Sequence, residues 1–291
     1  MDEFHFIVNP IARSGEGKKR FEAAAKHFDA EGIPYRVTFS EYAGHTPVIV
    51  REALQNGSKT LVAVGGDGTV RDVAGVLAGT DAVMGILPAG SGNDLCKSLG
   101  ISMNLDEALA VLKAGNVRKM DACLANDRLF FNVAGIGFDV EVLLRTDQYK
   151  EKLNGMLPYA LGIVSALKNL RPMTLTYSAN GEETTIQSCI FSVGNGKYIG
   201  GGMKAVPDAI VDDGLFDVII VKPVKRFVIL PLIAFYVGGK HVKLGLGKLM
   251  RCKKLRIHCP GMTLNMDGEL RDTDDAEFEI IPGGLCVRVP Q

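Results

Sequence analysis

Residues 60–72 read TLVAVGGDGTVRD, an apolar run that passes directly into two glycines, a carboxylate, a third glycine and a threonine. The run has the composition of a buried β-strand, and the residues after it favour the start of a helix. Such a turn places backbone N–H groups and the positive end of a helix dipole where a phosphate group can bind. Thr69 can add a hydroxyl contact and Asp67 can hold a magnesium ion, although the same residues also suit a plain strand-to-helix turn.

The N-terminal part of the chain alternates apolar runs with helical patterns up to about residue 124. This alternation predicts a parallel sheet covered by helices. The predicted strands are FHFIVNP (4–10), YRVTF (35–39), TLVAV (60–64) and AVMGILP (82–88). The predicted helices lie within 17–32, 45–57 and 104–115; the first two end at Gly32 and Gly57, and Asn104 caps the third.

Two other strand ends carry similar loops. The first strand is followed by Asn9, Arg13 and Ser14, with Gly15 and Gly17 as flexible backbone. The fourth is followed by GSGND at 90–94, where Asn93 or Asp94 also suits the N-cap of a helix. Because parallel strands end at one edge of a sheet, the three loops together predict a single phosphate site.

Beyond residue 125 the sequence changes to strand-like runs separated by turn residues. Asn180 and Gly181 stand between two such runs, as a hairpin turn requires. Helical patterns remain only around 159–170 and 225–237. The second half of the chain is therefore predicted to be mostly β.

The composition of the 291 residues narrows the class of protein. Hydrophobic residues make up 47%, enough for real cores, and 33 Lys+Arg balance 33 Asp+Glu, so charge predicts no nucleic-acid partner. Six cysteines without metal-ligand spacing indicate reduced thiols in a cytosolic protein. The apolar stretch from Phe227 is shorter than the ~20 residues that span a bilayer and contains Pro231, so no transmembrane helix is predicted.

Five motifs together resemble the catalytic family of diacylglycerol kinases, which includes soluble bacterial diacylglycerol kinases and YegS-like lipid kinases. GGDGT alone also occurs in NAD kinases and in relatives of phosphofructokinases, but an NAD kinase is expected to carry an NE motif in place of GSGND. The five motifs are NP (9–10), GGDGT (65–69), PAGSGNDL (88–95), DDGLFDV (212–218) and MDGE (266–269).

The resemblance implies two domains with the active site in the cleft between them. Residues 1–124 would form a nucleotide-binding α/β domain with a parallel, NAD-kinase-like sheet, and about 280–291 would pack back on it. Residues 125–279 would form a β-rich lipid-substrate domain, an antiparallel sandwich. The segment NVAGIGFD (132–139) resembles a family segment near the lipid cleft, and by itself it predicts a strand followed by a turn.

The resemblance also carries roles onto residues of this sequence. ATP would be bound by a set drawn from the loops, namely Asn9, Pro10, Arg13, Ser40, Gly65, Gly66, Asp67, Gly68, Thr69, Asp72, Ser91 and Asn93. Asp67 would support Mg²⁺, with Asp94 and Asp121 in the same carboxylate and water network. Arg71 and Asp72 stand where relatives often have Asn and Glu, which leaves the contact at the end of that loop open.

The second half contributes two further predictions. Glu269 of MDGE matches the general base of the family, although Asp267 and Gly268 are also a favoured turn pair that would leave Glu269 a solvated carboxylate. Asp213, with the backbone carbonyls of Ile210 and Leu215, matches a structural magnesium site, or else DDG simply makes a turn.

The implied function is an ATP- and Mg²⁺-dependent lipid kinase that converts diacylglycerol to phosphatidic acid. Phosphatidylglycerol, a sphingoid base or undecaprenol are alternative acceptors, and a non-catalytic nucleotide-binding regulator is an alternative class. The protein is expected in the cytoplasm, in peripheral contact with the inner membrane face. The basic segment 240–256 is one candidate for that contact, although KKLRIHC (253–259) also predicts an ordinary strand. Dimers occur in the family, but the sequence carries no self-complementary signal.

Overall fold

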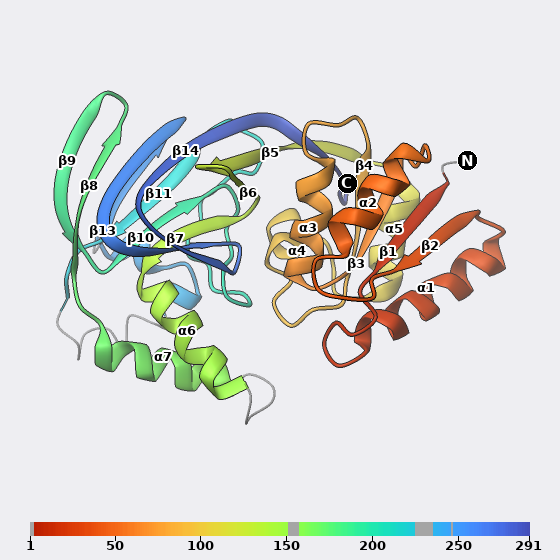
Figure 1. Ribbon diagram of the computed structural model, residues 1–291, viewed down its shortest axis with the longest axis horizontal. Helices are drawn as coiled ribbons and strands as arrows, with labels where there is room; N and C mark the ends of the chain where they lie inside the picture. Colours follow the sequence, from red (N-terminus) through yellow and green to blue (C-terminus); the bar gives the residue numbers. More distant parts are fainter. Residues whose placement is uncertain (1–2, 151–156, 225–234, 246) are drawn as a thin grey trace. The chain divides into compact units, whose positions relative to one another are not determined.

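The computed structural model describes residues 3–150, 157–224, 235–245 and 247–291, which form two compact units. Residues 1–122, 211–213 and 281–291 make the first unit, and 123–210 with 214–280 make the second. Two long strands, β5 (Val117–Ala125) and β14 (Glu269–Arg288), begin in one unit and end in the other (Figure 1).

The first unit is built on a parallel sheet, as the sequence predicts. Its strands lie in the order β2-β1-β3-β4, and the end of β14 adds a further parallel strand beside β4, where Cys286 pairs with Val83. The strands that precede the loops of interest are β1 (Phe4–Val8), β2 (Tyr35–Phe39), β3 (Thr60–Gly65) and β4 (Val83–Pro88).

Helices cover both faces of this sheet (Figure 1). On one face α1 and α5 pack on a core that includes Phe6 and Val62, and on the other face α2 and α3 pack against β1, β3 and β4. Phe6 lies 5.2 Å from Phe28 and 5.5 Å from Phe21, ring centre to ring centre. The bounds are α1 (Glu16–Glu31), α2 (Thr46–Gln55), α3 (Asp67–Leu77), α4 (Asp94–Leu99) and α5 (Leu105–Ala114).

The predicted helix ends are confirmed. α1 stops at Gly32, whose φ of 65° is the left-handed conformation that glycine adopts without strain. The side chain of Asn104 accepts a hydrogen bond from the backbone N–H of Glu107 and so caps α5. Gly17, in contrast, is no flexible loop residue: it lies in the first turn of α1, where a Cβ would stand 2.0 Å from the carbonyl oxygen of Asn9.

The second unit is antiparallel, as predicted. Its main sheet has the order β12-β11-β10-β7-β13-β14, and the hairpin β8–β9 adds to β13. Asn180 and Gly181 form the turn of that hairpin with φ of 54° and 83°, which confirms the hairpin prediction. The bounds are β6 (Arg128–Phe130), β7 (Val133–Gly137), β8 (Met173–Ala179), β9 (Glu182–Ser188), β10 (Ile190–Gly194), β11 (Phe216–Val221), β12 (Gly247–Cys252) and β13 (Lys254–Met266).

Two helices, α6 (Phe138–Lys150) and α7 (Leu157–Asn169), bury one side of this sheet. Because the opposite side packs on an aromatic core around Phe191 and Phe278, β10 is buried along its whole length. The helix predicted around 159–170 is confirmed. The turn predicted after residue 137 is wrong: alternating Val140 and Val142 do not suggest a helix, and packing against α7 decides the conformation.

The basic segment 240–256 is largely β-structure. Cross-strand carboxylates neutralise part of its charge, since Lys254 lies 2.7 Å from Glu279 and Arg251 lies 3.1 Å from Asp217. The prediction that KKLRIHC is an ordinary strand is confirmed, and membrane contact by this segment stays a prediction. Most of the helical pattern at 225–237 lies outside the described residues. Within the part that the structure describes, no helix is long and apolar enough to cross a membrane.

Candidate active site

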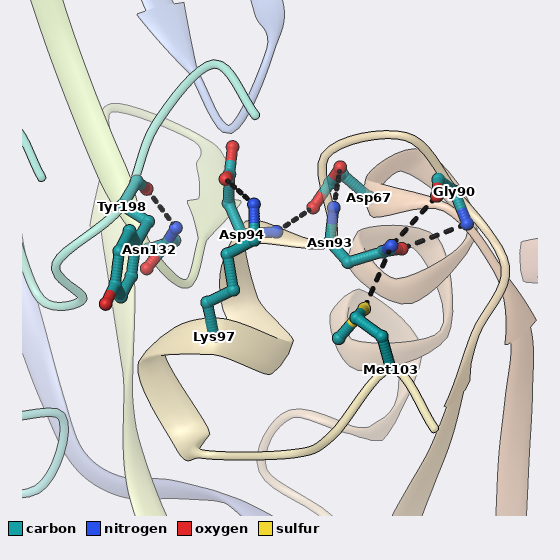
Figure 2. A network of polar contacts seen from close by, with 8 residues as sticks. All are labelled: Asp67, Gly90, Asn93, Asp94, Lys97, Met103, Asn132 and Tyr198. Atoms are coloured by element: carbon teal, nitrogen blue, oxygen red, sulfur yellow. Dashed lines mark hydrogen bonds and ion pairs between the residues drawn. The ribbon is translucent and has the colours of Figure 1, made fainter. Parts of the chain in front are cut away.

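The carboxylate of Asp67 joins two of the predicted loops. Asp67 begins α3, directly after β3, and its two oxygens accept hydrogen bonds from the backbone N–H groups at the start of α4 (Figure 2). The Asn93 N–H lies 2.8 Å from Oδ2, and the Asp94 N–H lies 2.6 Å from Oδ1. Asp67 therefore caps α4, a task that the sequence suggested for Asn93 or Asp94 themselves.

Asn93 closes its own loop instead. Its Oδ1 accepts from the Gly90 N–H at 3.0 Å, and its Nδ2 donates to the Gly90 carbonyl at 2.9 Å (Figure 2). Gly90 in turn packs on Gly66, because a Cβ on Gly90 would stand 2.4 Å from the Gly66 Cα. The paired glycines thus let the loops after β3 and β4 touch backbone to backbone.

The loop after β1 is tied to the same place. Asn9 donates from Nδ2 to the hydroxyl of Thr69 at 3.3 Å, and its Oδ1 accepts from the Ile11 N–H at 3.2 Å. Thr69 is buried, so this hydroxyl serves to hold the loop. The Ser40 N–H donates to the Val8 carbonyl at 2.8 Å, which places Ser40 at the neighbouring strand end. The structure therefore brings together the three strand ends that the sequence predicted to meet, and the end of β2 lies beside that of β1.

The start of α3 offers hydrogen-bond donors. No side chain caps this helix at Gly66, and the first-turn N–H groups of a helix have no partner within it. Space lies beside them, since apart from the adjacent residues and the backbone of α3 itself no atom stands within 4 Å of the position that a Cβ on Gly68 would take. An anion fits such a helix end by charge and by hydrogen bonding.

Next to it, the loop after β4 borders a hollow of about 190 Å³. Three cations and one carboxylate line this hollow, so its charge favours an anion. Arg13 and Ser91 were predicted, whereas Arg20 and Lys97 were missed. Their position in the sequence could have indicated them, because Arg20 lies about one turn inside α1, which follows the β1 loop, and Lys97 lies about one turn inside α4, which follows the β4 loop. The lining residues are Arg13, Glu16, Arg20, Pro88, Ala89, Gly90, Ser91, Gly92, Asn93, Lys97 and Met103.

Contacts hold the two missed cations in place. Arg20 donates from Nη2 to the carbonyl of Met103 at 2.6 Å, and Lys97 Nζ lies 3.8 Å from Oδ1 of Asp94. Guanidinium and ammonium groups are the ones with which proteins bind phosphate oxygens. Asp72, in contrast, pairs with Arg71 at 3.1 Å on α3.

The predicted magnesium ligands fall into three places. Asp67 and Asp94 are joined by the hydrogen bond described above. Asp121, on β5, accepts from the Gly283 N–H at 2.8 Å and so binds the end of β14. Asp213 lies with Ile210 and Leu215 in the turn before β11. Among the described residues no three His, Cys, Asp or Glu side chains group as a metal site. Mg²⁺ bound to phosphate needs only one or two carboxylates from the protein, so the pair Asp67 and Asp94 stays a prediction for this ion.

Glu269, the predicted base, is the first residue of β14 in the second unit. It pairs with Met266 across the turn formed by Asp267 and Gly268, whose φ values are 48° and 91°. The hairpin reading of MDGE is therefore confirmed, and Glu269 is exposed beside the turn. Its role as a base stays a prediction.

A buried carboxylate that the sequence did not single out lies in the same unit. Asp139, in the first turn of α6, accepts from Nδ2 of Asn265 at 3.3 Å. Burial raises the pKa of Asp139 to about 6, although the Asn265 amide and nearby backbone N–H groups favour the anion. No sequence pattern indicated that Asp139 is buried, because the segment 132–139 predicts a strand followed by a turn.

The first unit gathers strand-end loops beside a hollow lined by three cations, and an antiparallel unit follows it in the chain. This is the two-unit architecture with which the comparisons agree. Residues 3–125 match the diacylglycerol kinase catalytic domain, and residues 132–289 match the YegS C-terminal NAD kinase beta sandwich-like domain. The chain belongs to this family of lipid kinases.

Individual relatives cover nearly the whole chain. A Pseudomonas aeruginosa (strain UCBPP-PA14) protein named "Probable lipid kinase YegS-like" is 33% identical over 96% of this chain and 91% of its own length. A Mycobacterium tuberculosis (strain CDC 1551 / Oshkosh) protein named "Diacylglycerol kinase" is 28% identical over 98% and 94%. A crystal structure of a diacylglycerol kinase from Bacillus anthracis str. Sterne has a TM-score of 0.76 at 20% identity, over 99% of this chain and 97% of that one, which supports the fold.

We expect Asp67→Ala to lower the free energy of unfolding of the first unit by about 1–3 kcal/mol, because two backbone N–H groups of α4 lose their acceptor. Urea denaturation followed by circular dichroism measures this loss. Asp81→Ala, an exposed aspartate between α3 and β4, is the control and should change stability by less than about 0.5 kcal/mol. Equal stability of the two variants would contradict the capping role.

Asp139→Asn should change how stability depends on pH. The pKa of about 6 in the folded state lies above the ordinary 3.8, so the proton is held more tightly after folding. Its stabilisation is complete below about pH 4 and is lost as the pH rises through about 6. The Asn variant, which never ionises, should gain about 2 kcal/mol relative to wild type between pH 4.5 and pH 7.5.

Urea denaturation at the two pH values tests this expectation. The exposed Glu183→Gln on β9 is the control, and its stability difference from wild type should stay constant. A constant difference for Asp139→Asn as well would show that Asp139 has an ordinary pKa.

Proposed function

We propose that the protein transfers the γ-phosphoryl group of ATP to a lipid hydroxyl with the help of Mg²⁺, and that diacylglycerol is the acceptor and phosphatidic acid the product. The names of the relatives support a lipid acceptor. The single observation that carries the use of ATP is the meeting of an uncapped α3, the Asp67 carboxylate and the cationic hollow within the first unit.

The residues of the first unit divide the binding of ATP between them. The start of α3, around Gly68, holds phosphate oxygens by backbone N–H groups, and Arg13, Arg20 and Lys97 add positive charge. Asp67 and Asp94 hold the magnesium ion, which when bound neutralises charge on the phosphate oxygens. Positioning and charge of this kind supply most of the catalysis in phosphoryl transfer, because the transition state is loose.

Glu269 serves as the general base of the proposed reaction. Its carboxylate orients the acceptor hydroxyl and takes up the proton late, so a strong base is not required. Asp213, with the carbonyls of Ile210 and Leu215, holds a second magnesium ion that shapes the turn before β11 and takes no part in the chemistry. Because the acceptor is a membrane lipid, the protein must make peripheral contact with the cytoplasmic face of a membrane to reach it.

A methyl group at Gly68 should separate nucleotide binding from stability. Gly68→Ala adds a Cβ into open space, so the fold should remain and the helix should gain up to about 1 kcal/mol. The same Cβ would occupy the room that a phosphate group needs. Calorimetric titration with Mg·ATP should show affinity lowered by about ten- to a hundredfold, the loss of one or two hydrogen bonds to a charged group.

Gly75→Ala is the matched control, because Gly75 lies on the same helix with equally open space around it. It should give a similar gain in stability and wild-type ATP affinity. If Gly68→Ala binds ATP as tightly as Gly75→Ala, the phosphates do not lie at the start of α3.

Glu269→Gln should abolish most turnover while ATP binding survives. Loss of a general base costs about 10²–10⁴-fold in kcat, and a group used only in the chemical step contributes little to nucleotide affinity. Labelled ATP, detergent-dispersed lipids and thin-layer chromatography measure turnover on diacylglycerol, phosphatidylglycerol, a sphingoid base and undecaprenol.

In the same assay, chelation of Mg²⁺ should stop phosphorylation of the lipid. Turnover of none of these lipids by the wild type would favour a nucleotide-binding regulator.

A further inference from the structure

We propose that Asp267 is a positioning residue that fixes the location of Glu269. The inference rests on the proposed function, in which Glu269 is the general base. Asp267 makes the turn that immediately precedes Glu269, and it binds a loop that is remote in sequence. The geometry of this contact assigns Asp267 a role beyond shaping the turn.

One carboxylate accepts hydrogen bonds from three consecutive backbone N–H groups. Asp267 Oδ2 lies 2.6 Å from the Phe131 nitrogen, and Oδ1 lies 3.1 Å from that of Asn132 and 2.9 Å from that of Val133. The Asp267 N–H also donates to the Val133 carbonyl at 3.1 Å. Charge-assisted bonds to backbone donors are short and strong, so the contact is a clamp between the hairpin tip and residues 131–133.

A second side chain anchors the other half of the turn. Asn265 accepts with Oδ1 from the Gly268 N–H at 2.9 Å and donates with Nδ2 to Asp139 at 3.3 Å. Asn265 is buried, so its amide has few alternative orientations. Asp267 and Asn265 together hold both residues of the turn from two directions.

The loop that receives the clamp is itself held firmly. Asn195 donates from Nδ2 to the Phe131 carbonyl at 3.1 Å, and its backbone N–H donates to the Asn132 carbonyl at 2.9 Å. Asn132 donates through its own side chain to the Tyr198 carbonyl (Figure 2). Residues 131–133 therefore form a fixed support onto which the hairpin tip is bonded.

The hairpin alone does not need this clamp. Asp-Gly is among the favoured pairs for a two-residue turn with both φ values positive, and Asn180-Gly181 makes such a turn between β8 and β9. The turn can therefore form without the three hydrogen bonds that the Asp267 carboxylate accepts from residues 131–133. Their effect is to fix where the first residue of β14 stands, and that residue is Glu269.

The test is Asp267→Asn. Asparagine tolerates the left-handed backbone at least as well as aspartate, and Asn-Gly is a preferred turn pair, so the hairpin should persist. The neutral amide weakens the clamp. We expect kcat with the lipid that the wild type phosphorylates to fall by about tenfold or more, because small misplacement of a reacting group is costly. KM for ATP should be unchanged.

A double substitution separates positioning from folding. If Asp267 acts through Glu269, the variant Asp267→Asn/Glu269→Gln should have the same kcat as Glu269→Gln alone. A merely structural role would lower kcat further in both backgrounds. Should Glu269→Gln itself retain wild-type turnover, the proposed function fails at the base, a result distinct from the failure of the positioning role.

Asp272→Asn is the matched control on the same hairpin. Asp272 is exposed and accepts from the Thr263 hydroxyl at 2.6 Å across the two strands, so the same change there should leave kcat at the wild-type value. If Asp267→Asn does not fold, Asn265→Ala tests the second anchor and should lower kcat several-fold with KM for ATP unchanged. Wild-type kcat in Asp267→Asn, or in Asn265→Ala where that variant is used, overturns the proposal.

Discussion

The capping of α4 by Asp67 is the interaction on which the first unit's loops depend. A carboxylate at the start of one helix accepts the two N–H groups at the start of another, so the ends of β3 and β4 become one rigid piece. Glycine makes this possible, because Gly66 and Gly90 touch where any side chain would hold the loops apart. Around this piece, Asn9, Thr69 and Asn93 build the loops, while Arg13, Arg20 and Lys97 give the hollow beside them its charge.

In the second unit, too, a carboxylate accepts hydrogen bonds from the backbone N–H groups of another segment. Asp267 satisfies three backbone donors of a distant loop, as Asp67 satisfies two. In both cases the acidic residue of a glycine-containing turn supports another segment of backbone and does not point alone into solvent. Short motifs that resemble binding signatures can therefore owe part of their composition to the architecture of the loops.

The sequence predicts the strands, the helix ends and the loops that carry chemistry, because apolar periodicity and glycine positions are local signals. It does not predict that Asp67 caps α4, since this depends on how β3 and β4 align. Arg20 and Lys97 carry no motif, and only the fold brings them to the hollow. α6 was missed because its valines favour a strand, and packing on α7 overrules that preference. The roles of Glu269 and Asp213 rest on resemblance, and their chemistry is still a prediction.

The course of β14 constrains how the protein can be made. Cys286 lies beside Val83 in the parallel sheet of the first unit, so the edge of β4 stays unpaired until a segment some two hundred residues further along has left the ribosome. An exposed strand edge is a template for pairing with other chains. During synthesis, the edge of β4 in the N-terminal half of the chain therefore stays exposed until the end of β14 is made and pairs with it.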